Sequence, residues 1–274
     1  MKIICVANFK GGTGKTVTAC NLAAVLARDG KQVLLIDADA QHNATDFFGA
    51  DQGGPTLTDV LRGTCEPYWF DNVREGVRPN LDLLPADMEL LRLDLAAILN
   101  DPHIDSEPMD KRMFDFLDAV RSDGETDFVI IDCPPSFTAA SVAALVCCDE
   151  VILPTRADAF SRAGALELIE QVRGLHYYHV TPRFRVLLTM ADRSRLCRQV
   201  EEQLRRDGLE VFDTVIRASV CVGESSYARL PLYEYAPRSN AAQDYEALAR
   251  EICRDVGGRP QGSPLQGDGE EARG

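Results

Sequence analysis

The chain has 274 residues, of which 45% are hydrophobic, and a formal net charge of −14 at pH 7. This length and apolar content suit one α/β domain or two small ones, and no apolar run approaches the ~20 residues of a membrane-spanning helix. The negative charge argues against a general nucleic-acid coat protein, and nine cysteines without a C-x-x-C pair indicate reduced core thiols of a cytoplasmic protein rather than a metal cluster.

A glycine-rich loop follows the first predicted strand, residues 3–7, and precedes a predicted helix over residues 17–28. Its sequence is Lys10-Gly11-Gly12-Thr13-Gly14-Lys15-Thr16. Glycines allow successive backbone N–H groups to face one anion, and the new helix adds the positive end of its dipole. Lys15 is placed to reach the β- and γ-phosphates of a nucleotide, and Thr16 to hold Mg²⁺. The loop therefore predicts a nucleotide-phosphate site.

Carboxylates end two further apolar strands. The second predicted strand, residues 31–36, runs into Asp37 and Asp39, and another apolar strand, residues 128–131, ends on Asp132 in the Walker B pattern. Because the carboxyl ends of parallel strands meet at one edge of a sheet, these groups are expected where Mg²⁺ and the attacking water lie. The alternative for the Asp37–Asp39 segment is a solvated turn.

Strands and helices alternate along most of the chain. Residues 42–80 are expected to be irregular apart from a short helix at 56–61. Strands are predicted at 80–85, 150–155, 184–190 and 211–216, and helices at 88–99, 111–120, 141–147, 159–172, 194–206 and from Ser239 or Asn240 to Gly257. This alternation predicts an α/β fold with a doubly wound, mostly parallel sheet flanked by helices. We expect one domain over residues 1–256 and a disordered tail over 257–274.

The loop lacks the glycine of the common phosphate-loop spacing, because that position is Phe9, and it carries a second lysine, Lys10. Together with the segments D-A-D-A-Q and I-I-D-C-P-P-S, this variant resembles the deviant Walker A motif of the ParA/MinD superfamily of ATPases. Ala40 stands where that family usually has proline. The resemblance implies ATP and Mg²⁺ as cofactors. It assigns catalysis to Lys10, Lys15, Asp39 and Asp132, nucleotide binding to residues 10–16 and Thr18, and the metal to Thr16, Asp39 and Asp132.

Within the superfamily the chain is most similar to the small, Soj-like ParA type. The tail lacks the apolar face of a membrane helix, and the first strand begins at residue 3, which leaves no room for an N-terminal DNA-reading domain or a signal peptide. The resemblance implies an ATP-dependent homodimer, joined by Lys10 reaching the partner's ATP. It also implies slow hydrolysis, non-specific DNA binding, stimulation by a ParB-like partner and a nucleoid-associated role in plasmid or chromosome partition.

An arginine-rich stretch is the candidate DNA surface. Residues 173–206 contain eight arginines and three acidic residues, and we select Arg193, Arg195, Arg198 and Arg217 as DNA contacts. Taken singly, each arginine is better explained as a solvated helix residue than as a DNA contact. Cys221 replaces an arginine that Soj-like proteins often have. Two alternatives therefore stay open, a ParA-like positioning ATPase for a non-DNA cargo and a metabolic or cofactor-assembly ATPase on the same fold.

Overall fold

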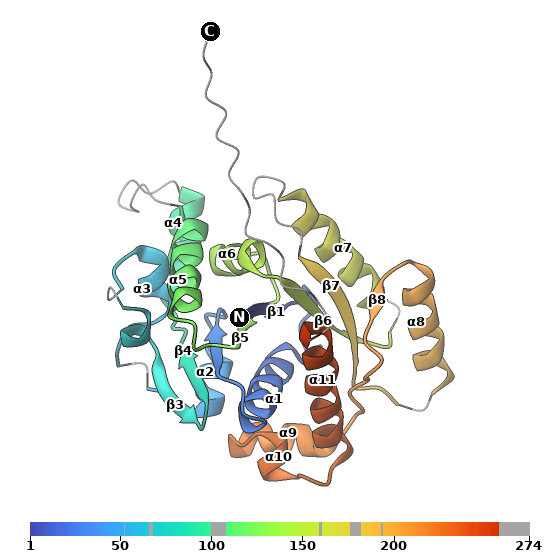
Figure 1. The fold of residues 1–274 in the computed structure, drawn as a ribbon. Coiled ribbons are helices and arrows are strands. Elements are labelled where there is room, and N and C mark those ends of the chain that lie inside the picture. Colours follow the sequence, from blue (N-terminus) through green and yellow to red (C-terminus); the bar gives the residue numbers. More distant parts are fainter. Residues whose placement is uncertain are drawn as a thin grey trace.

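The computed structural model describes residues 1–51, 53–65, 68–99, 108–158, 161–175, 182–192 and 194–257, without the side chains of 97–99, 161, 162 and 257. Eight strands form one sheet in the order β3-β4-β2-β5-β1-β6-β7-β8 (Figure 1). The strands are β1 Lys2–Val6, β2 Val33–Asp37, β3 Arg74–Arg78, β4 Leu81–Leu84, β5 Phe128–Asp132, β6 Glu150–Arg156, β7 Arg183–Thr189 and β8 Glu210–Val211.

Helices cover both faces of this sheet. They are α1 Lys15–Arg28, α2 Asn43–Phe48, α3 Leu57–Arg62, the 3₁₀ helix η1 Trp69–Asn72, α4 Leu90–Leu99, α5 Met109–Asp123, α6 Ala139–Cys147, α7 Ser161–Gly174, α8 Arg195–Arg206, α9 Val220–Ala228, α10 Leu232–Tyr235 and α11 Asn240–Gly257. Side chains of α1, α2, α10 and α11 pack on one face, and those of α3 to α8 pack on the other. Along β2, Leu34 and Ile36 face the second layer while Val33 and Leu35 face the first, as strand alternation requires.

The strand order places the glycine-rich loop at the centre of the sheet. β1 pairs in parallel with β5 on one side and β6 on the other. The strands β2 to β5 all lie on one side of β1 and the strands β6 to β8 on the other, so the strand order switches sides at β1. In open α/β sheets, ligands bind at the carboxyl ends of the strands at such a switch point. The loop after β1 is therefore flanked by the segments that follow β5 and β6.

The doubly wound, mostly parallel sheet is confirmed, and its one antiparallel pair is β3 with β4 at the edge. The expectation of an irregular segment over 42–80 was wrong, because α2, η1 and β3 lie there in addition to the helix at α3. These elements are short, so no periodicity was visible. The strand expected at 211–216 is limited to β8, and Ala191 and Arg217 form only an isolated bridge beyond it. The segment 258–274, expected to be disordered, lies outside the described residues.

Ser194 caps α8, as expected, by accepting a hydrogen bond from the backbone N–H of Cys197 at 3.1 Å. Within the part of the chain that the structure describes, none of the helices combines the length and the apolar character needed to cross a bilayer.

Candidate nucleotide-binding site

The glycine-rich loop is held by neighbouring strands while its glycines adopt conformations that other residues avoid. Gly12 and Gly14 have φ angles of +70° and +91°. The backbone N–H of Lys10 donates to the side chain of Asn8, which in turn donates to the carbonyl of Pro154 on β6 at 2.8 Å. The Thr189 hydroxyl on β7 donates to the carbonyl of Thr13 at 2.8 Å. The loop is thus fixed from β6 and β7 before any ligand binds.

Lys15 begins α1 and points back into this loop. Its side chain is largely buried, with 7% of the residue exposed, and its ammonium donates to the carbonyl of Lys10 at 3.2 Å. Burial lowers the pKa of Lys15, and the nearby carboxylates of Asp132 and Asp39 oppose that shift. A desolvated ammonium at the start of a helix is a strong partner for a phosphate.

Two buried carboxylates lie side by side where β2 and β5 end. Asp37 and Asp132 are direct partners in the parallel register. Asp37 accepts from the N–H and hydroxyl of Thr45, both at 2.8 Å, and burial raises its pKa to about 6. Asp132 is completely buried, and neither of its oxygens has a hydrogen-bond partner among the described residues. Burial and the charge of Asp37 raise the pKa of Asp132 well above its usual value.

The donor set fits Mg²⁺. An orphaned buried carboxylate requires a compensating charge, and carboxylate, hydroxyl and water oxygens are the ligands that Mg²⁺ prefers. Asp39 is half-buried and uses one oxygen to accept the N–H of Gln41 at 3.0 Å. The charge of Asp39 raises the pKa of both Asp132 and Lys15, and the Thr16 side chain lowers the pKa of Asp132. The structure therefore brings these predicted residues together.

Thr18 is the exception among the predicted nucleotide ligands. Its hydroxyl lies 3.2 Å from the hydroxyl of Tyr245 on α11, and its backbone N–H donates to the carbonyl of Gly14. Both polar groups are therefore engaged inside the protein and the residue is fully buried. Thr18 holds α1 against α11 instead of facing the loop.

Lys10 lies at the mouth of the loop, where about a third of its side chain is exposed. Its ammonium forms an ion pair with both carboxylate oxygens of Asp158, at 2.8 and 2.7 Å, in the segment after β6. The two residues are 148 positions apart in the chain. In this structure Lys10 therefore contacts its own subunit.

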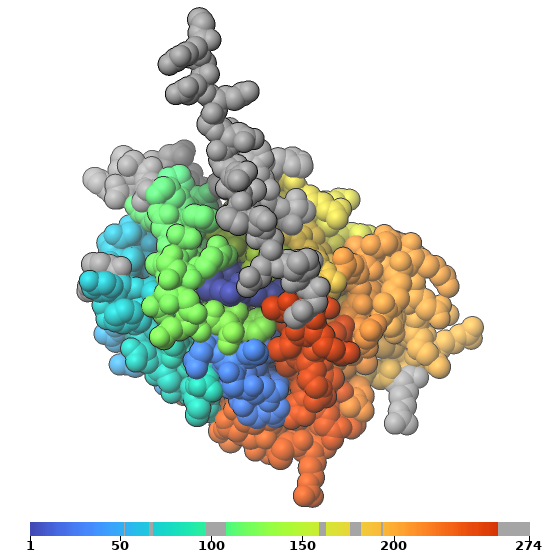
Figure 2. Space-filling model, in the orientation of Figure 1, coloured from blue at the N-terminus to red at the C-terminus, as the bar shows by residue number. Residues whose placement is uncertain are grey.

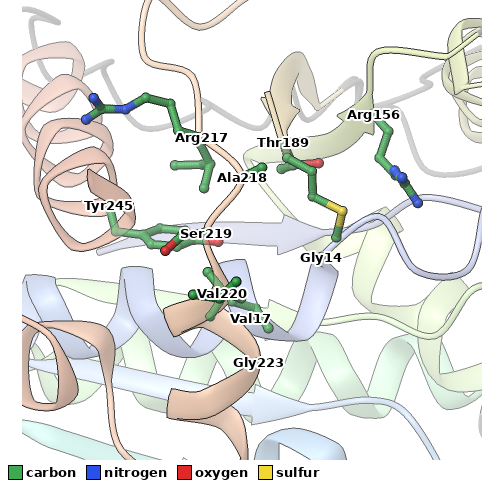
Figure 3. A pocket seen from close by; sticks show the side chains of 13 residues that line it. Gly14, Val17, Arg156, Thr189, Arg217, Ala218, Ser219, Val220, Gly223 and Tyr245 are labelled. Atoms are coloured by element: carbon green, nitrogen blue, oxygen red, sulfur yellow. The ribbon is translucent and has the colours of Figure 1, made fainter. Parts of the chain in front are cut away.

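A cavity of about 640 Å³ opens beside Gly14 and Val17 (Figure 3). Its other walls come from the ends of β6 and β7, from the segment that continues into α9 and from Tyr245 on α11, and they are mainly apolar. Met190 has a φ of +52°, a backbone conformation that non-glycine residues adopt rarely and that clusters at functional sites. These walls were not predicted from the sequence, because Met190, Ala218 and Val220 belong to no phosphate-binding pattern.

The predicted DNA contacts have different environments. The helix α8 lies at one side of the molecule (Figure 1; orange in Figure 2). Arg195 and Arg198 are exposed on its first turn, and neither has a side-chain partner among the described residues. Arg217 is instead bound to both oxygens of Asp244, and its guanidinium turns away from the cavity (Figure 3). Arg193 lies outside the described residues.

The arginine-rich stretch does not form one surface. Arg183 and Arg185 lie at the start of β7, the edge of the sheet opposite the glycine-rich loop, and both pair with Asp255. The arginines at the end of α8, Arg205 and Arg206, pair with glutamates one turn earlier. In the described part of this stretch, Arg173, Arg195 and Arg198 form no ion pair, and of these only Arg195 and Arg198 lie together on one helical turn.

The sequence matches known proteins over most of its length. Residues 1–185 match a family model described as an AAA domain. The chain is 36% identical over 264 residues to the chromosome partitioning protein ParA of Caulobacter vibrioides, covering 92% of this chain and 94% of that protein. It is 37% identical over 266 residues to the chromosome-partitioning ATPase Soj of Thermus thermophilus, covering 92% and 96%.

Solved structures share the fold. Apo McdA of Cyanthece has a TM-score of 0.78 at 22% identity, covering 92% of this chain and 99% of that one. Cobyrinic acid a,c-diamide synthase of Mycobacterium smegmatis with bound ADP and magnesium has a TM-score of 0.75 at 25% identity, covering 94% and 96%. The fold, the variant phosphate loop and these relatives agree on an enzyme that uses ATP and Mg²⁺. The chain belongs to the ParA/MinD superfamily of ATPases.

Proposed function

We propose that this protein is a partition ATPase of the small ParA type, whose ATP-bound form dimerises, binds DNA without sequence preference and is released when hydrolysis follows. The observation that carries the proposal is that the buried ammonium of Lys15, in the glycine-rich loop, lies within electrostatic reach of the unpartnered buried carboxylate of Asp132, at the end of β5. Lys15 binds the phosphates, while Thr16, Asp39 and Asp132 hold Mg²⁺ and its water shell. Curated relatives that are partition proteins support the biological role.

The base and ribose occupy the cavity beside Gly14. Its apolar walls suit a purine, and its position next to the loop leaves the phosphates over the N–H groups of residues 11–16. Bound Mg²⁺ supplies charge neutralisation on the phosphates, while Lys15 and the loop orient them. Turnover is slow in the isolated protein, and a ParB-like partner accelerates it. Such slow turnover lets the ATP state act as a signal, which suits an assembly on the nucleoid.

Lys10→Ala should remove ATP-dependent dimerisation. The ammonium must leave Asp158 to reach the partner's ATP, and a charge-assisted contact of this kind contributes about 10- to 100-fold at each of the two sites. Size-exclusion chromatography with light scattering, with and without ATP, measures the change. Lys31→Ala removes a lysine at the opposite edge of the sheet and should dimerise normally. An unchanged dimer in Lys10→Ala contradicts the role of Lys10.

Charge reversal at the first turn of α8 should abolish DNA binding. Arg195 and Arg198 lie three residues apart on one face without acidic partners, so Arg195→Glu with Arg198→Glu turns an attractive surface into a repulsive one. Two lost phosphate contacts should reduce the slope of log affinity against log salt by about 2 per protomer. ATP binding should be unchanged, because neither residue lines the nucleotide cavity.

The matched control makes the same charge change elsewhere. Arg206→Glu with Arg250→Glu reverses two exposed arginines that pair with glutamates on their own helices, and it should leave DNA affinity within about threefold of wild type. Equal losses in the two double variants would assign the effect to net charge. Intact DNA affinity in the α8 variant would show that the first turn of α8 is not the DNA-binding surface.

A second candidate function is positioning a cargo other than DNA. The observation that favours it is α9, which carries no basic residue and exposes Val220 and Tyr227 by 80% and 94%. Fluorescence anisotropy of a random-sequence duplex with ATP, ADP or no nucleotide, at two salt concentrations, separates the two functions. Binding only with ATP and only at low salt supports DNA partition, whereas no binding in any state supports a different cargo.

A further inference from the structure

The end of β6 supplies two side chains that flank the glycine-rich loop. β6 lies beside β1 in the sheet, so its carboxyl end emerges next to the loop. Asp158 binds Lys10 where the loop begins. Arg156 lines the nucleotide cavity with Gly14, where the loop ends, and Figure 3 shows its side chain extending from β6 towards the loop. No arginine of this subunit was predicted from the sequence to contact ATP.

Arg156 differs from the other charged residue on the cavity wall. Arg217 is bound by Asp244 and points away. Arg156 is exposed, and within the described part of the chain its guanidinium forms no hydrogen bond or ion pair. An unpaired guanidinium on the cavity wall attracts an anionic ligand electrostatically. A guanidinium with no protein partner also has none to give up when it binds a ligand.

We propose that Arg156 binds the phosphate chain of ATP from the β6 side, opposite α1, as an additional nucleotide-binding residue. This rests on the proposed placement of ATP in the loop and cavity. The phosphate chain is the expected target because Arg156 lies on the cavity wall together with Gly14 of the phosphate-binding loop, while the remaining walls are mainly apolar. The planar fork of arginine suits two phosphate oxygens better than an ammonium does.

The test compares nucleotides that differ only in phosphate number. Calorimetry with ATP and ADP, and ligand-observed NMR with adenosine, are applied to wild type, Arg156→Ala, Arg156→Lys and Lys15→Ala, in Mg²⁺ at two salt concentrations. Arg156→Ala should weaken ATP and ADP binding about 10- to 100-fold and leave adenosine unchanged. Arg156→Lys should lie between. Arg238→Ala, an exposed arginine outside the cavity and without a side-chain partner among the described residues, should match wild type.

Wild-type affinity for ATP in Arg156→Ala overturns the inference. An equal loss for adenosine also overturns it, because Arg156 would then contact the base or ribose. Failure of the proposed function has a different signature. If wild type binds no ATP, or if Lys15→Ala binds as well as wild type, the placement of ATP in the loop is wrong. Thermal unfolding of Arg156→Ala should match wild type, since no side-chain hydrogen bond or ion pair within the described structure is lost.

Discussion

Lys15→Ala should lower ATP turnover by about 10²- to 10³-fold, the usual loss when one preorganised charge is removed from a water-excluded site. Lys15 is the buried cation of the glycine-rich loop, held at 3.2 Å from the carbonyl of Lys10. Burial already strengthens its electrostatic interactions, and alanine leaves a gap that no neighbouring cation of α1 can fill. Phosphate release measures turnover, and titration with a fluorescent ATP analogue measures affinity.

The matched control for this variant is Lys31→Ala. Lys31 precedes β2 and therefore lies at the opposite edge of the parallel sheet from the loop. Its removal changes the net charge equally and should leave both turnover and affinity unchanged. If Lys15→Ala hydrolyses ATP at the wild-type rate, the loop is not the catalytic phosphate site. The proposed roles of Thr16 and Asp132 in holding Mg²⁺ would then be wrong as well.

Asp132→Asn should abolish Mg²⁺-dependent hydrolysis and yet stabilise the nucleotide-free protein. The carboxylate is completely buried beside Asp37 with no hydrogen-bond partner among the described residues, an arrangement that costs about 1–3 kcal/mol. Asparagine has nearly the same shape and no charge. For a chain of this size the gain corresponds to a Tm about 2–6 °C higher, measured by calorimetry without nucleotide. A lower Tm would contradict the view that the buried carboxylate of Asp132 destabilises the nucleotide-free protein.

The pH dependence of this gain gives a further check. Burial raises the pKa of Asp37 to about 6 and that of Asp132 well above its ordinary value, so the folded state binds these protons more tightly than the unfolded chain does. The stability that comes from protonating Asp37 is therefore greatest at low pH and is lost as the pH rises through about 6, and the contribution of Asp132 likewise falls as the pH rises. The difference in Tm between Asp132→Asn and wild type should accordingly be largest near pH 7 and shrink towards pH 5.

The nucleotide loop and the sheet were predictable from the sequence because their signals are local. Glycines at positions that adopt positive φ, a lysine at the start of a helix and aspartates directly after apolar strands all act within a few residues. Because the carboxyl ends of parallel strands lie at the same edge of a sheet, their pairing places Asp132 and Asp39 near Lys15. Short elements such as α2 and β3 were missed, since six or fewer residues carry too little periodicity.

By itself, the sequence determined that this protein is a doubly wound ATPase with a deviant phosphate loop. Only the tertiary structure decided which charges are available. Lys10 pairs with Asp158 across 148 residues and Arg217 with Asp244 across 27, while Arg156 stands unpaired at the cavity. The arginine-rich stretch divides between opposite edges of the sheet because β7 runs through it. Residue type sets what a side chain can bind, but its neighbours in space determine whether it is still free to bind a ligand.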